Sequence, residues 1–278
     1  MSVRVRDLFM GELDSLRHEP IDKRIRAQLG DRTVVDSTSA LLVWEPKRVV
    51  PSYAVPVEDV DADLGAEPDA SDPPGAPEGS PLGGRRVLDP GIPFSVHTTD
   101  GEPVSVRTPV GERGGAAFRP SDADLAGYVV LDFGAFDAWF EEDERNFAHP
   151  RDPFHRIDIV HSSRHVRVER DGELLAESTK PYLLFETGLP VRYYLPRDDV
   201  RTDLLRPSDA RTWCAYKGQA SYWSFADEDD LVWSYPEPLR DATEVTGRMA
   251  FFNERVDIVV DGERLERPVT PWSPPNAA

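Results

Sequence analysis

The sequence has a single cysteine, Cys214, among its 278 residues. One thiol excludes a disulfide within the chain and any zinc site built from several thiolates, and it is typical of a reducing compartment. Because Lys217 follows closely, a nucleophilic thiol is one interpretation of Cys214. Regular strand alternation places these two side chains on opposite faces, which favours an inert core thiol unless a bulge near Gly218 brings them together.

Long apolar runs are also missing. No stretch of about 18 apolar residues occurs, and the first fifteen residues, MSVRVRDLFMGELDS, lack the roughly 7 to 15 apolar residues in a row that a signal peptide needs. We therefore expect a soluble, cytoplasmic protein without a membrane-spanning segment.

Positive charge is scarce. The sequence has 32 Lys and Arg against 51 Asp and Glu, a formal net charge of −19 and a pI near 4.7. This balance repels nucleic-acid phosphates and anionic lipids, so we expect no nucleic-acid or membrane partner. The acidic runs at 141–144 and 227–230 are expected to be solvated turns.

The chain contains an internal repeat. Residues 25–45 align without a gap on residues 166–186, and residues 53–64 align on residues 193–204 after the loss of one residue. Two copies of one domain are the simplest interpretation. The predicted order is an N-terminal extension (1–24), a degenerate first copy (25–146) with a disordered insertion (65–90), a connector (147–165), a second copy (166–270) and a tail (271–278).

Short runs of aromatic and β-branched residues, separated by turn residues, dominate the second copy. Asp171-Gly172 and Asp261-Gly262 predict two-residue hairpin turns. Only Arg197 to Leu205 is predicted to be helical, because Pro196 can open a helix. The predicted fold class is all-β, with two tandem copies of a small antiparallel β-barrel or sandwich-like domain that has one short helix each.

Several linked motifs carry a family resemblance. The segments AESTKPYLLFETGLPVRYYLPRDDVRTDLL, TWCAYKGQASYWS and VWSYPEPL resemble the domain-of-unknown-function 427 family, also labelled nucleotidyltransferase-like family 9, over nearly all of Val166 to Pro268. The segments VVDSTSALLVWEP and HPRDPFHRID are similar to the first copy and connector of two-domain members. The resemblance implies a small all-β domain of bacteria and some eukaryotes and implies no particular activity.

The nucleotidyltransferase label finds little support in the residues. Such enzymes place a Gly-Ser pair before a strand with two metal-binding carboxylates. Here Gly79-Ser80 lies in a Pro-rich loop, and Asp59, Asp61 and Asp63 fall on a short predicted helix. Both features lack the required structural context.

Charged and aromatic side chains gather in the second copy. The first copy has Pro51-Ser52 where the second has Val191-Arg192. Cations pair with carboxylate or phosphate groups, and aromatic rings stack on planar groups, so we predict a site for a small anionic or planar metabolite. Its predicted residues are Glu186, Arg192, Tyr194, Lys217, Tyr222, Trp223 and Trp233.

Other interpretations stay open at this point. The aromatic residues can simply be core, and Arg192 can pair with Glu186 across a hairpin. The chain can be an enzyme for an anionic metabolite with Lys217 or Cys214 as the reactive group, or a protein-interaction module with an aromatic hot spot. An extended chain spreads the evenly spaced His149, His155, His161 and His165 too far apart for a metal site, so none is predicted. Cofactor, reaction and oligomeric state are unknown from the sequence.

Overall fold

Antiparallel strands make up most of the regular structure in the computed structural model, which describes residues 2–66 and 78–274. This confirms the predicted all-β class. The described residues divide into a first unit, within 1–80 and 86–152, and a second unit, within 81–85 and 153–278. The boundary at Asp152 and Pro153 lies inside the segment predicted to be a connector.

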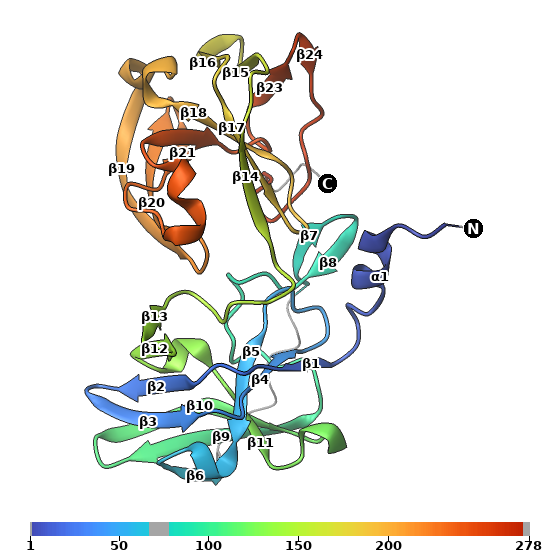
Figure 1. Ribbon diagram of the computed structural model, residues 1–278, viewed down its shortest axis with the longest axis vertical. Helices are drawn as coiled ribbons and strands as arrows, with labels where there is room; N and C mark the ends of the chain where they lie inside the picture. Colours follow the sequence, from blue (N-terminus) through green and yellow to red (C-terminus); the bar gives the residue numbers. More distant parts are fainter. Residues whose placement is uncertain (1, 67–77, 275–278) are drawn as a thin grey trace. The chain divides into compact units, whose positions relative to one another are not determined.

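The first unit has a seven-stranded and a four-stranded sheet (Figure 1). The larger sheet has the order β1 (Arg17–Pro20), β4 (Leu41–Trp44), β5 (Ser52–Pro56), β11 (Tyr128–Leu131), β10 (Gly111–Pro120), β9 (Gly101–Thr108) and β6 (Asp63–Ala66). The smaller sheet has the order β13 (Glu144–Asn146), β12 (Ala138–Glu141), β2 (Ile25–Leu29) and β3 (Arg32–Ser37). Strand β1 lies in the predicted N-terminal extension, so this unit begins earlier than the repeat indicated.

The second unit also has a seven-stranded and a four-stranded sheet (Figure 1). The larger sheet has the order β14 (Ile157–His161), β17 (Tyr182–Glu186), β18 (Arg192–Pro196), β22 (Arg248–Phe251), β21 (Glu228–Ser234), β20 (Gly218–Phe225) and β19 (Leu205–Cys214). The smaller sheet has the order β16 (Glu173–Ser178), β15 (Val166–Arg170), β23 (Asp257–Val260) and β24 (Glu263–Arg264). Strand for strand, both sheets follow the order found in the first unit.

One core in each unit joins its two sheets. In the second unit, Val168 and Ile258 of the smaller sheet and Leu195, Val232 and Phe251 of the larger sheet belong to one buried apolar cluster. The other face of the larger sheet carries a second cluster that contains Tyr194, Trp233 and Tyr235. Since neighbouring strand residues point to opposite faces, strands such as β17, β18 and β22 contribute to both clusters. The candidate site lies on this second face.

A serine–aspartate hydrogen bond occurs at the same place in both units. Ser37 Oγ donates to Asp59 Oδ2 at 2.6 Å, and Ser178 Oγ donates to Asp199 Oδ2 at 2.6 Å. Each serine oxygen also accepts the backbone N–H two residues later. These four residues are identical pairs in the sequence repeat, so the repeat preserves a structural contact as well as a strand order.

The predicted hairpin turns form, whereas the predicted helix does not. Asp171 (φ 52°) with Gly172, and Asp261 (φ 52°) with Gly262, form the predicted hairpin turns. The helix predicted over Arg197 to Leu205 is wrong: two 3-10 turns, η4 (Arg197–Asp199) and η5 (Thr202–Leu204), lead directly into β19. Among the described residues, no helix combines the length and apolar character that crossing a membrane requires.

The remaining short elements include a helix that the repeat analysis did not predict. They are α1 (Val5–Gly11), η1 (Val57–Asp59), η2 (Ala123–Leu125), η3 (Phe133–Ala135), η6 (Arg240–Val245) and the paired strands β7 (Ser80–Leu82) and β8 (Arg85–Val87). Strands β7 and β8 correct the prediction of disorder over 65–90 for their own residues. Residues 67–77 of that predicted insertion lie outside the described residues.

Candidate ligand-binding site

The most unusual group on the second face of the larger sheet is a buried ion cluster. Lys217 Nζ donates to Glu186 Oε1 at 2.7 Å and to Glu186 Oε2 at 2.6 Å. His155 Nε2 lies 3.0 Å from Glu186 Oε1, and its ring stacks on Tyr216. The side chains of Lys217 and Glu186 are only 10% and 8% exposed. We call Glu186, Lys217, His155 and the adjacent Cys214 the Lys217 cluster.

A tight turn between β19 and β20 brings Lys217 to this position. Cys214 ends β19 and pairs with Gly218, which begins β20. Gly218 has a φ of 98°, and a Cβ there would lie 3.2 Å from the Glu237 carbonyl oxygen, so glycine suits the turn. Leu239 N–H donates to the Lys217 carbonyl at 3.1 Å. Because Lys217 lies in the turn, strand alternation does not separate it from Cys214.

Opposite charges within the cluster keep both Glu186 and Lys217 ionised. Burial opposes ionisation of Glu186, but the charge of Lys217 and the hydrogen bond from His155 outweigh it and lower the pKa of Glu186 to about 2. Burial likewise opposes the charged form of Lys217, yet Glu186, Cys214 and Tyr194 together raise its pKa above the ordinary value of 10.5. Lys217 therefore stays protonated at neutral pH, which argues against its predicted alternative role as a nucleophilic amine.

Tyr194 and Trp233 border the cluster. Trp233 Nε1 donates to the Tyr194 hydroxyl at 3.0 Å, and burial raises the pKa of Tyr194. Tyr222 pairs with Trp233 across the β20–β21 ladder, and its hydroxyl lies 2.6 Å from Thr212 Oγ1. Burial also raises the pKa of Tyr222. Four of the seven predicted site residues, namely Glu186, Lys217, Tyr194 and Trp233, thus lie together, with Tyr222 at their edge.

Arg192 lies on the same face but has a different partner from the one weighed in the sequence. Its Nη1 and Nη2 donate to Glu254 Oε2 and Oε1, both at 2.7 Å, so the alternative pairing with Glu186 is wrong. Thr270 Oγ1 donates to Glu254 at 2.6 Å. The guanidinium lies 5.4–5.9 Å from three ring centroids, those of Trp233, Phe252 and Trp272. Arg192 is therefore a neutralised, enclosed cation.

Trp223 does not belong to this group. It packs against the core between the two sheets, and the Arg197 guanidinium lies 5.5 Å from its ring centroid. Its neighbour Tyr222 points to the opposite face, where it contacts the second cluster. His155 contacts Glu186 but was not among the site residues predicted from the sequence. Its contact with Glu186 connects residues 31 positions apart, and no local pattern in the sequence indicates it.

The first unit keeps the carboxylate but replaces its partners. Glu45, which aligns with Glu186, lies 2.7 Å from His97 Nδ1 and accepts the Thr98 N–H at 2.6 Å. Ser52 and Ala54 occupy the positions of Arg192 and Tyr194. At these aligned positions, the described part of the first unit therefore has neither the arginine nor the tyrosine hydroxyl of the second unit.

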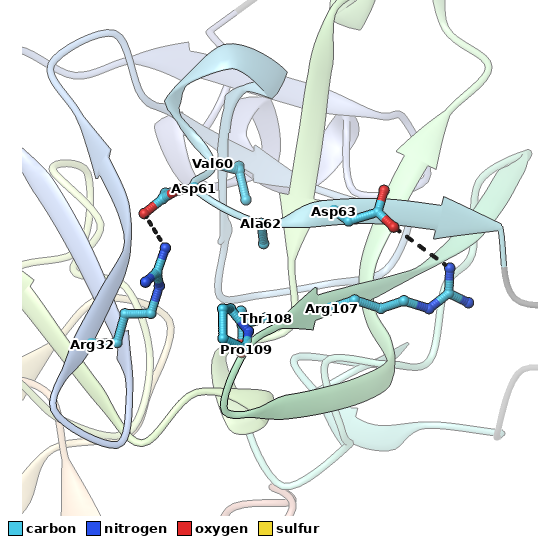
Figure 2. Close-up of a pocket in the computed structure, with 8 residues that line it drawn as sticks. All are labelled: Arg32, Val60, Asp61, Ala62, Asp63, Arg107, Thr108 and Pro109. Carbon is cyan, nitrogen blue, oxygen red and sulfur yellow. Dashed lines mark hydrogen bonds and ion pairs between the residues drawn. The ribbon is translucent and has the colours of Figure 1, made fainter.

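A separate hollow of about 530 Å³ lies in the first unit (Figure 2). Figure 2 shows ion pairs on two sides of it, Arg32 with Asp61 and Arg107 with Asp63, at 2.5 and 4.0 Å. Asp59 accepts from Ser37 instead. The three aspartates considered for metal-dependent nucleotidyl transfer thus have separate partners, and this arrangement does not support that label.

Fold and site together define a class: a two-sheet antiparallel β domain with a buried lysine–glutamate–histidine cluster on the outer face of its larger sheet. Residues 158–262, which lie in the second unit, match the family described as Domain of unknown function (DUF427). This confirms the resemblance seen in the sequence motifs. No curated protein matches the chain.

Proposed function

We propose that the second unit binds a small planar metabolite at the Lys217 cluster, and that the protein acts in the cytoplasm. The observation that carries this proposal is the buried Lys217–Glu186 ion pair beside Cys214, which is only partly buried. A buried ion pair seldom stabilises a fold more than apolar residues of the same volume do. Perturbed titratable groups with specific partners are typical of functional sites.

The charges favour a planar, polar ligand over a strongly anionic one. Glu186 offsets the charge of Lys217, and Glu254 offsets that of Arg192. An ammonium has three N–H donors, and two of those on Lys217 meet the two oxygens of Glu186. The third donor, with the Cys214 thiol and the Tyr222 ring, can hold the polar edge and the face of a planar molecule.

We further propose that the first unit is a diverged copy of the family domain. The shared strand order and the repeated serine–aspartate bond support a common origin. In this proposal the first copy has lost the ligand site, since serine and alanine replace Arg192 and Tyr194, and Glu45 contacts His97 and the Thr98 N–H.

A thermal-shift screen of purines, pterins and aromatic carboxylates tests the binding function. A compound at a hundredfold excess over its Kd adds about 2.7 kcal/mol to the stability of the native protein and raises its Tm. Tyr222→Leu, which removes the aromatic ring, and Cys214→Ser should weaken this response. Lys180→Met, which removes an exposed lysine of the same unit, is the matched control and should leave it unchanged. Equal responses in all three variants would refute the proposed site.

One observation favours a second candidate function, an enzyme with Cys214 as nucleophile. Cys214 pairs with Gly218 across the turn that contains Lys217, and cysteines beside a lysine are a common kind of reactive thiol. Under this alternative, Glu186→Gln speeds alkylation of Cys214 by iodoacetamide because Lys217 loses its competing anion. Lys217→Met slows it. Identical alkylation rates in both variants and the unmodified protein would rule out an activated thiol.

A further inference from the structure

The second unit contains a cavity that is distinct from the Lys217 cluster. Its volume is about 170 Å³. It lies beside Tyr193 of β18, on the side of the larger sheet that faces the core. Its lining residues are Pro190, Val191, Tyr193, Asn253, Val256, Ile258, Leu265, Glu266 and Pro268.

Sheet register identifies the equivalent position in the first unit. Ile258 pairs with Val168, and Trp139 pairs with Ala27. Since Ala27 aligns with Val168 in the repeat, Trp139 is the counterpart of Ile258. Tyr193 likewise aligns with Tyr53. The first unit therefore has an indole where the second has a smaller aliphatic side chain.

A second ring fills the same place in the first unit. Phe133 lies two residues beyond β11, as Asn253 lies two residues beyond β22. The Phe133 and Trp139 rings stack with centroids 5.2 Å apart and an interplanar angle of 11°, and Tyr53 lies 5.2 Å from Trp139. Two aromatic rings thus occupy the position that the cavity takes in the second unit.

Two polar groups at the cavity, the Tyr193 hydroxyl and Asn253 Oδ1, have no hydrogen-bond partner among the described residues. In the first unit the Tyr53 hydroxyl donates to Glu141 at 2.6 Å, but register places Val260 at the position of Glu141. Among the described residues the Tyr193 hydroxyl makes no hydrogen bond. Asn253 is 7% exposed, donates from Nδ2 to the Val191 carbonyl at 2.9 Å, and leaves Oδ1 buried without a hydrogen-bond partner. A buried acceptor without a donor destabilises a fold.

We propose that this cavity binds a small molecule with an aromatic ring that carries an N–H or O–H donor. The ring replaces the rings of Trp139 and Phe133, and its donor satisfies Asn253 Oδ1. The size fits, since an apolar cavity of roughly 150 Å³ accommodates benzene. This site is separate from the one under the proposed function, because none of its lining residues belongs to the Lys217 cluster.

Indole is the probe for the experiment, with toluene as a ring of similar width that lacks a donor. Ligand-observed NMR titration of the full chain should give one indole site with a Kd of about 0.1–1 mM, as expected for so small a ligand. Ile258→Trp supplies the side chain of the first unit and should abolish binding while circular dichroism shows the same β content. No indole binding by the unmodified chain, or unchanged binding by Ile258→Trp, overturns the proposal.

Asn253→Ala keeps the cavity and removes the acceptor, so the test does not depend on Ile258→Trp folding. Loss of one neutral hydrogen bond should weaken indole binding about fivefold and leave toluene binding within about twofold. Equal weakening of both probes overturns the role of Asn253 as the polar anchor. Cys214→Ser should not alter indole binding, so the outcome of this experiment is independent of the thermal-shift result for the Lys217 cluster.

Discussion

Replacing Lys217 with methionine should destabilise the second unit strongly at neutral pH. The change leaves the Glu186 carboxylate buried and without the cation that its two oxygens meet at 2.7 and 2.6 Å. The pKa of Glu186 falls from its ordinary value of 4.5 to about 2 in the intact cluster. Since one pKa unit corresponds to about 1.4 kcal/mol, this shift corresponds to a net preference for the charged carboxylate of about 3 kcal/mol, after the cost of burial. Removal of one partner of a buried pair typically costs about 3–5 kcal/mol.

The stability that the Glu186 carboxylate contributes should decrease as the pH falls. Because the pKa of Glu186 is lowered in the folded state, its contribution is fully present above pH 4.5 and is lost as the pH falls toward about 2. In Lys217→Met, burial dominates and the pKa of Glu186 rises instead. The stability difference between the two proteins should therefore be largest near pH 7 and shrink as the medium becomes acidic.

Urea unfolding at pH 7 and pH 4, with hydrogen exchange of β17 and β20 peptides to report on the second unit, measures this difference. The double variant Glu186→Leu with Lys217→Met is the control and should recover most of the lost stability, because it leaves no buried charge unpaired. A loss below about 1 kcal/mol in Lys217→Met, equal at both pH values, is what a solvated surface pair gives. That result would refute the reasoning.

Two further predictions concern stability and use the same urea unfolding measurement. Arg192→Met should cost about 3–5 kcal/mol because the buried Glu254 carboxylate loses its bidentate partner. Arg201→Ala, at an exposed pair, should leave the unfolding midpoint almost unchanged; similar losses in both variants would contradict the assignment of Arg192 as an enclosed cation. Ser178→Ala removes a hydrogen bond to the Asp199 carboxylate and should cost about 1.5–3 kcal/mol, and an unchanged unfolding midpoint would show that this contact is not stabilising.

The sequence predicted the strands well because the information is local. Alternating apolar residues, with Asp171-Gly172 and Asp261-Gly262 as turns, specify hairpins within a few residues. It predicted the segment after Pro196 poorly. The two 3-10 turns there are held by contacts outside the segment, including the Arg201 N–H to the Leu175 carbonyl, and a local helix signal carries no information about such contacts.

The candidate site was predictable only in part for the same reason. Strand alternation puts Arg192 and Tyr194, which are two residues apart in β18, on one face of the sheet. It could not give the partner of Arg192, because Glu254 lies 62 positions away. Strand alternation also failed for Lys217, which lies in a turn where the regular pattern does not apply.

Trp272 and Thr270 give the C-terminal segment a definite role. The family match ends at residue 262 and begins at residue 158, yet Thr270 holds Glu254, Trp272 lies over Arg192, and His155 contacts Glu186. A fragment trimmed to the family boundaries would keep most strands of the second unit but lose β24 and the residues that contact its two buried ion pairs. A fragment made for biochemical work on the second unit should therefore extend beyond the residues that match the family at both ends.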